Sequence, residues 1–585
     1  MRNLLLVSLG GTLWGCGDKD DTDTTAPTPV DTDTTADDTG DTKEGDPDYD
    51  GDGSPDDEDC SDTDPEVYPG ADEIPYDGID QDCDGYDLTD FDLDGYDAIT
   101  VGGDDCNDED PAIHPGADDV VGNKTDDDCD GEIDEGIEKI PEDFPLTCTG
   151  SGAASSHFIA VSAKGYAVLG GNFTGEIDFH PYEEYAEESA AADGDIFISM
   201  LDSSGEYQWT WVASSDESIT LHAMAADTDG NILLAGAFSG TVDFDYGPGE
   251  YSLTASGGSD AFVARISSGG SILWASTFGG KTDDAALGVA SGTDGRVYAT
   301  GTFSDTVTFL DKDGEVTASG TEDAWMMQLG ASGETTWAAT FGGKSATASG
   351  VAITSDSSNN VTMAGSYSGA IALTDGVSTD SGEGLFMVEY NLEGTAQWGQ
   401  SLPGSLTVSA LVTDNSDNLY LGGTLSGSAD FDASADSEAS LTAAGSDGFV
   451  CMMDSAGAYT SATLYGGSDD DTIDALALDP SNQLYVAGTF QDSITVESHT
   501  ESAEGGSDVF ALRLSSDQSL DWMMRIGNST DDGIAGIATD KDSRGWLAGT
   551  FTESLDLDPT EGDDSRSAPD GESGVWAVRV QSGGP

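Results

Sequence analysis

The sequence predicts an all-β protein in which a seven-bladed β-propeller follows a loop-rich acidic repeat module. Three observations lead to this prediction. Short alternating segments recur about every 60 residues from residue 145 onward, which is typical of propeller blades. Gly is abundant, with 77 residues, as in turn-rich β proteins. Runs of Asp at every second position, each ending in Gly, recur between residues 46 and 138 and indicate a separate module.

The composition excludes whole classes of function. The 585 residues include 115 Asp and Glu but only 17 Lys and Arg, so the formal net charge is -98. A nucleic-acid binder needs a basic surface to displace the counterions of the phosphates, and this chain carries the opposite charge. Anionic membrane surfaces are equally poor partners. The sequence therefore predicts no nucleic-acid partner.

The first 16 residues predict export. They comprise a basic residue, an apolar run too short to span a bilayer, and a lone cysteine. The ending Leu13-Trp14-Gly15-Cys16 resembles the lipobox of bacterial lipoproteins, which implies a lipidated Cys16 at the outer membrane or cell surface. Membrane contact is expected only through this anchor. An ordinary signal peptide and a secreted or periplasmic protein are the alternative. Residues 17–45, rich in Asp, Thr and Pro, predict a disordered linker.

Residues 46–138 are so acidic that a folded domain there needs cations. Asp48, Asp50, Asp52 and Gly53 have EF-hand spacing, in which alternate carboxylates turn inward around one hard cation and Gly permits the bend. The pattern occurs four times. Metal ligands are predicted at Asp48, Asp50, Asp52, Asp59, Asp80, Asp82, Asp84, Asp90, Asp92, Asp94, Asp105, Asp126, Asp128 and Asp130. Only the first copy has an acid at position 12, namely Asp59; Asp87, Asp97 and Asp134 are candidates to complete the others.

The acidic module is an internal duplication, with repeat 1 at residues 46–88 and repeat 2 at residues 89–138. Each repeat holds two cysteines 23 positions apart, and in an exported protein this predicts one disulfide per repeat. The predicted disulfides are Cys60–Cys83 and Cys106–Cys129. Cys148 and Cys451 remain, and a bridge between them is not expected because they fall in different blades.

This module resembles the metal-binding repeat of the bacterial MopE surface proteins and, more loosely, the calcium loops of thrombospondin type 3 repeats. The MopE resemblance implies an association with copper. Copper prefers imidazole or sulfur ligands, however, and the module offers only His114, so several calcium ions are the expected cofactor. A solvated acidic spacer without ions is the alternative.

From residue 145 to residue 585, seven repeat units each predict four strands. Gly-x-Phe motifs end at Phe173, Phe238, Phe303, Phe490 and Phe551, with Tyr367 and Leu425 in the remaining two units. The last unit lacks its outer strand, and residues 146–161 are expected to supply it, which would close the ring. These units resemble the bacterial SBBP propeller repeats. A solenoid is the alternative.

Two sets of propeller residues are candidates for a site at the propeller mouth. His157 and His222 occupy the same position in adjacent units, at the start of the predicted innermost strand. Acid pairs precede that strand in several units, including Asp283 with Asp284, Asp470 with Asp471 and Asp531 with Asp532. Converging carboxylates would favour a metal or a cationic ligand. The competing interpretation is a solvated acidic rim and two strand-end histidines.

The sequence predicts a non-catalytic, monomeric surface protein whose propeller binds an unknown extracellular ligand, a glycan or a protein. No nucleophile triad, zinc motif or phosphate loop is present. Two alternatives stay open: an extracellular polysaccharide hydrolase or lyase with carboxylates at the propeller mouth, and a surface protein that captures copper or calcium.

Overall fold

The computed structural model of the chain divides into two compact units, Met1–Leu88 and Thr89–Pro585. The structure describes residues 47–108, 110–115, 117, 125–126, 129, 137–138, 154–162, 164–178, 187–189, 194–203, 207–246, 249–309, 315–374, 376–434, 439–552, 554–556, 565–567 and 573–580. The predicted signal peptide 1–16 with Cys16, the linker 17–45, Asp128, Asp130, Asp134 and Cys148 lie outside these residues.

The described part of the acidic module consists of turns. Residues 47–88 contain no strand or helix, and repeat 2 adds the short 3-10 helix η1 (Ile99–Val101). A hydrophobic core is nearly absent there, since only Val67, Ala98 and Ile113 are buried apolar residues among those described. The two predicted disulfides, Cys60–Cys83 and Cys106–Cys129, are confirmed. Covalent bridges thus substitute for a core in each repeat.

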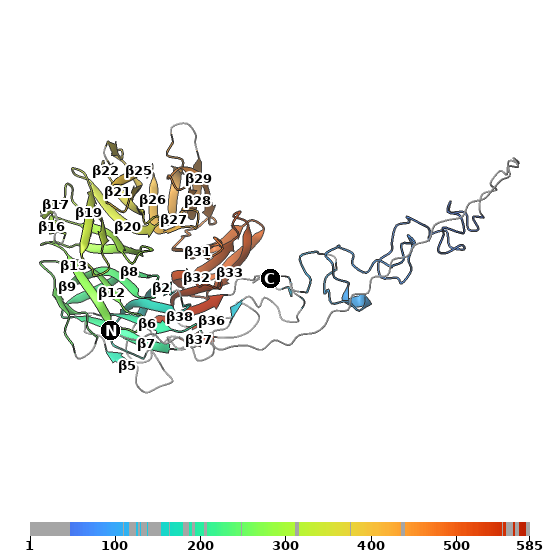
Figure 1. The fold of residues 1–585 in the computed structure, drawn as a ribbon, viewed down its shortest axis with the longest axis horizontal. Coiled ribbons are helices and arrows are strands. Elements are labelled where there is room, and N and C mark those ends of the chain that lie inside the picture. Colours follow the sequence, from blue (N-terminus) through green and yellow to red (C-terminus); the bar gives the residue numbers. More distant parts are fainter. Residues whose placement is uncertain are drawn as a thin grey trace, which may run out of the picture. The chain divides into compact units, whose positions relative to one another are not determined.

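The predicted seven-bladed, all-β propeller is confirmed (Figure 1). Each blade is an antiparallel sheet of four strands, named in order from the innermost outward. Blade 1 is β2 (Ala154–Val161), β3 (Ala167–Phe173), β6 (Asp195–Leu201) and β7 (Tyr207–Ser215); blade 2 is β8 (Ser218–Ala226), β9 (Ile232–Ser239), β12 (Asp260–Ile266) and β13 (Ile272–Phe278); blade 3 is β14 (Ala285–Ser291), β15 (Val297–Phe303), β18 (Asp323–Leu329) and β19 (Thr335–Phe341).

The remaining blades repeat this order. Blade 4 is β20 (Thr347–Ser355), β21 (Val361–Ser368), β24 (Glu383–Tyr390) and β25 (Ala396–Pro403); blade 5 is β26 (Ser405–Thr413), β27 (Leu419–Asp430), β28 (Ser440–Met453) and β29 (Tyr459–Tyr465); blade 6 is β30 (Ala475–Leu478), β31 (Leu484–Val496), β32 (His499–Leu514) and β33 (Leu520–Ile526); blade 7 is β34 (Gly533–Thr539), β35 (Gly545–Thr552), β38 (Ser573–Val580) and β1 (Ile137–Glu138).

Short hairpins extend from the loops between the second and third strands. They are β4 (Glu176–Asp178) with β5 (Glu187–Ser189), β10 (Thr241–Asp243) with β11 (Ser252–Thr254), β16 (Thr306–Thr308) with β17 (Glu315–Thr317), β22 (Ala372–Thr374) with β23 (Val377–Ser378), and β36 (Ser554–Asp556) with β37 (Ser565–Ser567). In blade 5 and blade 6 the long strands themselves form this extension.

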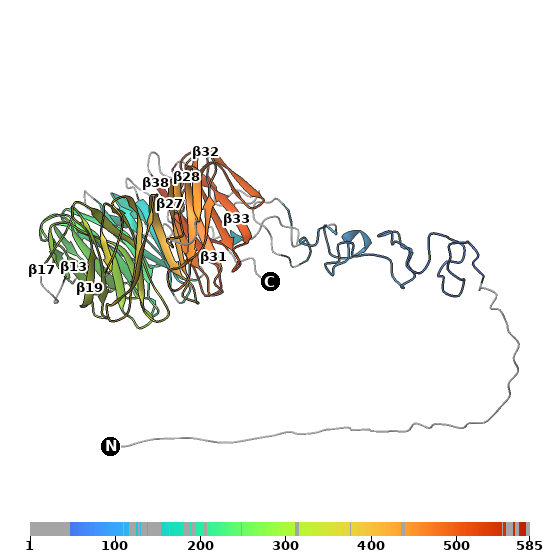
Figure 2. The same ribbon diagram turned by 90° about the horizontal axis from the view of Figure 1, so that it is seen from above.

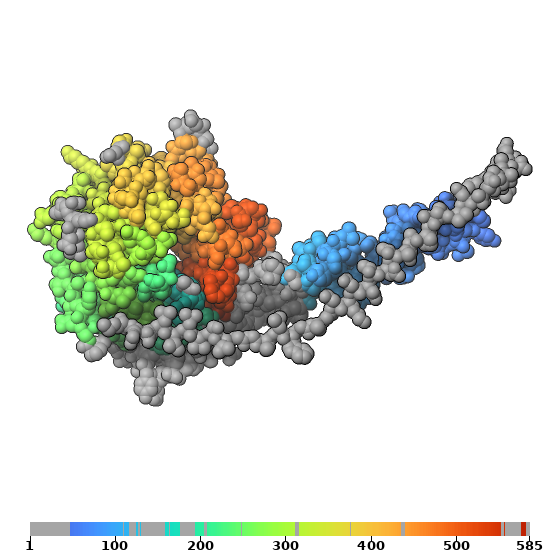
Figure 3. All heavy atoms as spheres, in the orientation of Figure 1, coloured from blue at the N-terminus to red at the C-terminus, as the bar shows by residue number. Residues whose placement is uncertain are grey.

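The ring is closed around the innermost strands. Each innermost strand contacts that of the next blade, and β34 of blade 7 contacts β2 of blade 1. The colours in Figure 3 accordingly pass from green through yellow to red around the ring, in chain order. Figure 2 shows the neighbouring sheets packed face against face. Apolar side chains fill these boundaries. Consecutive residues of the second and third strands, such as β15 and β18, are buried, so both faces of these strands pack against neighbouring blades.

An N-terminal strand closes the last blade, as predicted, but it does not come from the expected residues. Ile137 of β1 pairs with Val580 of β38. Residues 154–161, part of the segment predicted to close the ring, form the innermost strand of blade 1 instead. The first blade needs its own innermost strand before β3, so the chain must supply the closing strand further upstream. Among the described residues, no helix is long and apolar enough to cross a membrane.

Candidate metal centres in the acidic repeats

The first acidic loop gathers its three alternate carboxylates. Oxygens of Asp48, Asp50 and Asp52 lie within 4.8 Å of one another. Backbone N–H groups of Gly51 and Ser54 each donate to one oxygen, on Asp48 and Asp52 respectively, both at 2.7 Å. The second oxygens of Asp50 and Asp52 are shielded from solvent and accept no hydrogen bond from any described residue. The loop therefore fixes one oxygen and turns the other toward a common centre, as a cation site requires.

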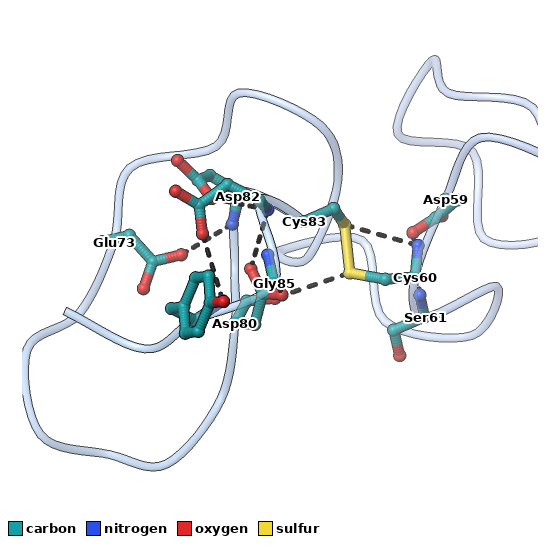
Figure 4. The surroundings of a disulfide bond; sticks show 10 residues. Asp59, Cys60, Ser61, Glu73, Asp80, Asp82, Cys83 and Gly85 are labelled. Atoms are coloured by element: carbon teal, nitrogen blue, oxygen red, sulfur yellow. Dashed lines mark hydrogen bonds between the residues drawn. A yellow bond between two sulfur atoms is a disulfide. The ribbon is translucent and has the colours of Figure 1, made fainter. Parts of the chain in front are cut away.

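The second loop gains a ligand candidate that the sequence did not reveal. Oxygens of Glu73, Asp80 and Asp82 lie within 4.8 Å of one another (Figure 4). Glu73 accepts the backbone N–H of Asp82 through Oε1 at 2.7 Å, while its Oε2 is shielded and accepts nothing from the described residues. Asp84 accepts the N–H of Tyr86 at 3.1 Å. The signal that could have found Glu73 is the acid that follows Pro-Gly-Ala-Asp in repeat 1.

The third loop groups Asp90, Asp92 and Asp94 within the same 4.8 Å limit. Asp108, outside the predicted set, accepts the N–H of Phe91 at 3.1 Å. Asp105 also lies near the third loop, since the charges of Asp105 and Asp108 both raise the pKa of Asp92. Asp97, a candidate to complete this loop, instead accepts the hydroxyl of Thr89 at 2.6 Å. The third loop is thus approached by carboxylates more than ten positions downstream.

Two further groups combine an aspartate with a disulfide. Asp59 lies with Cys60 and Cys83, and Asp105 lies with Cys106 and Cys129. The sulfur atoms are oxidised in both cases, so no thiolate is available and only the carboxylate can bind a metal. Of the fourth loop, the structure describes Asp126 and Cys129, so the predicted ligands Asp128 and Asp130 stay predictions.

The electrostatics of the module favour a bound cation. Residues 47–108 contain no Lys or Arg. Burial raises the pKa of Asp50, Asp92 and Asp105, and neighbouring carboxylates raise the pKa of each further. The clustered acids therefore repel one another until a positive charge compensates them.

The donor set identifies the class of metal that fits. The described ligand candidates offer carboxylate oxygens, which suit hard cations such as Ca²⁺. His114 is the only imidazole of the module; its ring stacks on Tyr96 with centroids 5.0 Å apart. The residues present fit a calcium-like ion, with Asp48, Asp50 and Asp52 as ligands in one loop and Glu73, Asp80 and Asp82 in another.

The propeller acid pairs occupy separate boundaries between blades. The first members, Asp283, Asp470 and Asp531, are exposed and accept backbone N–H groups of Ser259, Ser446 and Ser507 at 3.0 to 3.2 Å. The second members, Asp284, Asp471 and Asp532, are at most 3% exposed. Burial raises the pKa of Asp284 and Asp471 to about 6 and that of Asp532 to about 7.

His157 and His222 share a backbone position. Each is the extra residue of a β-bulge, in β2 and β8, the innermost strands of blades 1 and 2. The side chain of His157 lies outside the described atoms. A functional role for this pair stays a prediction.

Two stretches of the chain, residues 59–87 and 105–135, match the family model Cu-binding MopE, whose description is "Putative metal-binding motif". The regulatory protein FlaEY of Caulobacter vibrioides is 24% identical over 392 residues, which are 63% of this chain and 34% of that protein. The chain thus spans about a third of the length of this curated relative.

Solved structures similar to the chain include β-propellers. The WD40 repeats of RRP9 are 11% identical, with a TM-score of 0.39, over 74% of this chain and 98% of that one. The β-propeller domain of the Trilobed protease from Pyrococcus furiosus is 7% identical, with a TM-score of 0.35, over 73% of this chain and 95% of that one.

Proposed function

We propose that the chain is an exported, lipid-anchored surface protein whose acidic repeats bind calcium and whose propeller is a non-catalytic recognition domain. The observation that carries the calcium assignment is the set of carboxylate oxygens that are shielded from water and accept no hydrogen bond from the described residues, in loops without a basic side chain. Oxygens in that state are suited to a hard cation.

Calcium would stabilise the folded module in place of a hydrophobic core. Few apolar side chains are buried among the residues of 47–117 that the structure describes, and large ones such as Tyr49, Tyr86 and Leu93 are exposed. The disulfides hold each repeat together covalently, but they do not compensate the clustered negative charge. Ion binding and ordering of the loops are therefore coupled, and the module is rigid only where calcium is available.

The non-catalytic role that we propose for the propeller rests on how the carboxylates of one cavity are used. One cavity of about 390 Å³ is lined by turn residues of blades 5, 6, 7 and 1, including Asp414, Asp479 and Asp540. Each of these three aspartates accepts backbone N–H groups of its own turn. Such acids fix turns, and each of the three is held by the backbone of its own turn.

Calorimetric titration of the chain without its first 16 residues tests the proposal. Calcium should bind at several sites, and Asp50→Asn with Asp52→Asn should remove one of them. Glu58→Gln, an exposed acid outside the cluster, is the matched control. Tight copper binding with no calcium binding would support metal capture instead, and absence of both would leave an acidic spacer.

A further inference from the structure

Five blades carry a buried aspartate on the third strand, opposite the residue that ends the Gly-x-Phe motif. These are Asp195, Asp260, Asp323, Asp447 and Asp508, each at most 6% exposed. Oδ2 of Asp260, Asp447 and Asp508 accepts the backbone N–H of a residue three or four positions earlier, at 2.9 to 3.2 Å. This aspartate is thus a repeated part of the blade.

At three boundaries a second buried carboxyl lies beside the first. The resulting carboxyl pairs are Asp260 with Asp284, Asp447 with Asp471, and Asp508 with Asp532. Between Asp447 and Asp471 stands only a glycine: a Cβ on Gly466 would lie 2.8 Å from Oδ1 of Asp447 and 2.6 Å from Oδ2 of Asp471. Gly279, Gly527 and also Gly342 lie directly against Asp260, Asp508 and Asp323, so a glycine faces the third-strand aspartate whether or not a second acid is present. Gly466 therefore leaves the space between Asp447 and Asp471 free of a side chain.

One oxygen in each carboxyl pair lacks a donor. Oδ1 of Asp260, of Asp447 and of Asp508 is buried and accepts no hydrogen bond from any described residue. Buried carboxylate oxygens are normally paired, and two adjacent carboxylates repel each other in a poorly solvated site. Each carboxyl pair therefore requires either a proton or a positive charge.

The boundary between blades 3 and 4 shows the arrangement without a second acid. Ala348 has the backbone position of Asp284, since its N–H donates to the carbonyl of Glu322 as that of Asp284 donates to Ser259. Both oxygens of Asp323 then accept backbone N–H groups, from Ser319 and Gly320. At this boundary, where Ala348 takes the place of the second acid, both oxygens of Asp323 are thus used.

The three carboxyl pairs differ in the charge around them. Beside Asp508, the guanidinium of Arg525 lies 2.7 Å from Oδ2 and supplies positive charge. In the part of the chain that the structure describes, this is the only ion pair to any of the three carboxyl pairs. At boundary 2/3, between blades 2 and 3, Asp260 has instead the hydroxyl of Ser256 nearby, which favours its charged form but carries no charge.

The titratable groups that face the other two carboxyl pairs are negative. Asp284 is faced by Asp260 and Asp283. At boundary 5/6, between blades 5 and 6, Asp471 is faced by Asp447 and Asp469. These two pairs therefore depend on a proton more than the pair beside Arg525 does.

We propose that Asp260 with Asp284, and Asp447 with Asp471, each hold one shared proton in mildly acidic surroundings and release it to solvent as the pH rises toward neutral. The two blade boundaries are thereby a pH-sensitive latch on the propeller. The proton converts one carboxylate into an O–H donor toward the oxygen that lacks one, as in other carboxyl dyads.

The direction of the effect follows from linkage. Burial, reinforced by the neighbouring carboxylates, raises the pKa of Asp284 and Asp471 to about 6 in the folded chain. The unfolded chain binds the same proton with a pKa of about 4. The folded state therefore holds more protons between these values, so this contribution to stability is full below pH about 4 and is lost as the pH rises through about 6.

Urea unfolding of the full chain in EDTA, at pH values from 5 to 8, tests the latch. Nine of the ten Trp residues lie between residues 209 and 576, so their fluorescence reports the propeller. The unfolding midpoint of the unaltered chain should fall as the pH rises. Asp471→Asn should reduce that fall, because the neutral amide has no proton to release as the pH rises. Asp470→Asn, the exposed neighbour, should leave the fall unchanged.

An infrared measurement keeps the proposal testable if Asp471→Asn fails to fold. The folded, unaltered chain should show the carbonyl band of a protonated carboxyl near pH 5.5, and the band should vanish by pH 8. Absence of the band would overturn the proposal, as would an equal pH dependence in the unaltered chain and Asp471→Asn. A calcium-induced rise in the midpoint that Asp471→Asn abolishes would also overturn it, since a metal would then occupy the carboxyl pair.

Discussion

The indole of Trp274 lies on the backbone of Gly333, across the boundary between blades 2 and 3. A Cβ on Gly333 would stand 2.7 Å from the indole ring, and the indole Nε1 donates to the carbonyl of Ala331 at 3.0 Å. The same contact joins Trp209 to Gly270, Trp337 to Gly394, and Trp398 to Gly457. A Trp–Gly contact therefore links each of the first four blades to the next.

The boundary between blades 5 and 6 lacks both partners of this contact. Ser461 has the register position on β29 that Trp274 has on β13. In blade 6 the corresponding turn carries Gln518, whose φ is 71°. A non-glycine residue accepts the left-handed turn conformation here, so the turn alone does not require glycine. The indole that packs on the turn in the other blades imposes the requirement for glycine.

Gly333→Ala should destabilise the propeller by about 2–4 kcal/mol. About 1 kcal/mol comes from the left-handed backbone, and the rest from the clash with Trp274. Gly295→Ala is the matched control, since its φ of 81° is similar to the 87° of Gly333 but nothing lies within 4 Å of the added Cβ. Urea unfolding followed by Trp fluorescence measures both variants. Equal losses would show that the indole imposes no constraint.

The sequence was sufficient for the fold because each blade repeats the same strand signals. The Gly-x-Phe end of the second strand and the outer Trp locate the strands even where single motifs degenerate, as at Leu425. The sequence was not sufficient to locate the strand that closes the propeller ring. β1 spans only Ile137 and Glu138, and two residues carry no periodicity that could distinguish them from a linker.

The candidate metal site was only partly predictable for a similar reason. Asp48, Asp50 and Asp52 are close in sequence, so their spacing alone places them on one loop. Glu73 reaches Asp80 and Asp82 from several residues upstream, and Asp108 reaches the third loop from well downstream, through turns that no local pattern encodes. Spacing likewise could not show which member of an Asp-Asp pair is buried, since the two side chains of such a pair are chemically identical.

Glu73→Gln should weaken calcium binding at one site about tenfold or more, because it removes a charged oxygen from the group with Asp80 and Asp82. The amide keeps an oxygen that can accept the N–H of Asp82, so the loop itself should persist. Calorimetric titration measures the effect. Asp72→Asn, the exposed preceding acid, serves as the control and should bind calcium like the unaltered chain. An unchanged affinity in Glu73→Gln would remove this residue from the ligand set.

Removing the disulfide of repeat 1 by Cys60→Ala with Cys83→Ala should destabilise that repeat by about 2–4 kcal/mol, since it frees a closed loop that contains few buried apolar groups. Calcium should partly restore order, because the carboxylate ligands remain. Protease cleavage within residues 46–88, with and without calcium, measures the effect. The propeller should keep its unfolding midpoint, and a loss there would contradict the independence assumed for the repeat.

Removal of β1 should weaken the propeller at its closing blade. Ile137 and Glu138 pair with Val580 and Arg579 of β38, and no other residue that the structure describes pairs with this outer edge. A chain beginning at residue 134 should therefore be more stable than one beginning at residue 145, by about 1–3 kcal/mol for the few backbone hydrogen bonds lost. Urea unfolding followed by Trp fluorescence compares the two. Ile137→Pro in the longer chain removes one backbone donor and should give an intermediate stability. If the two chains unfold at the same midpoint, packing of the innermost strands β34 and β2 closes the ring and the short strand contributes nothing.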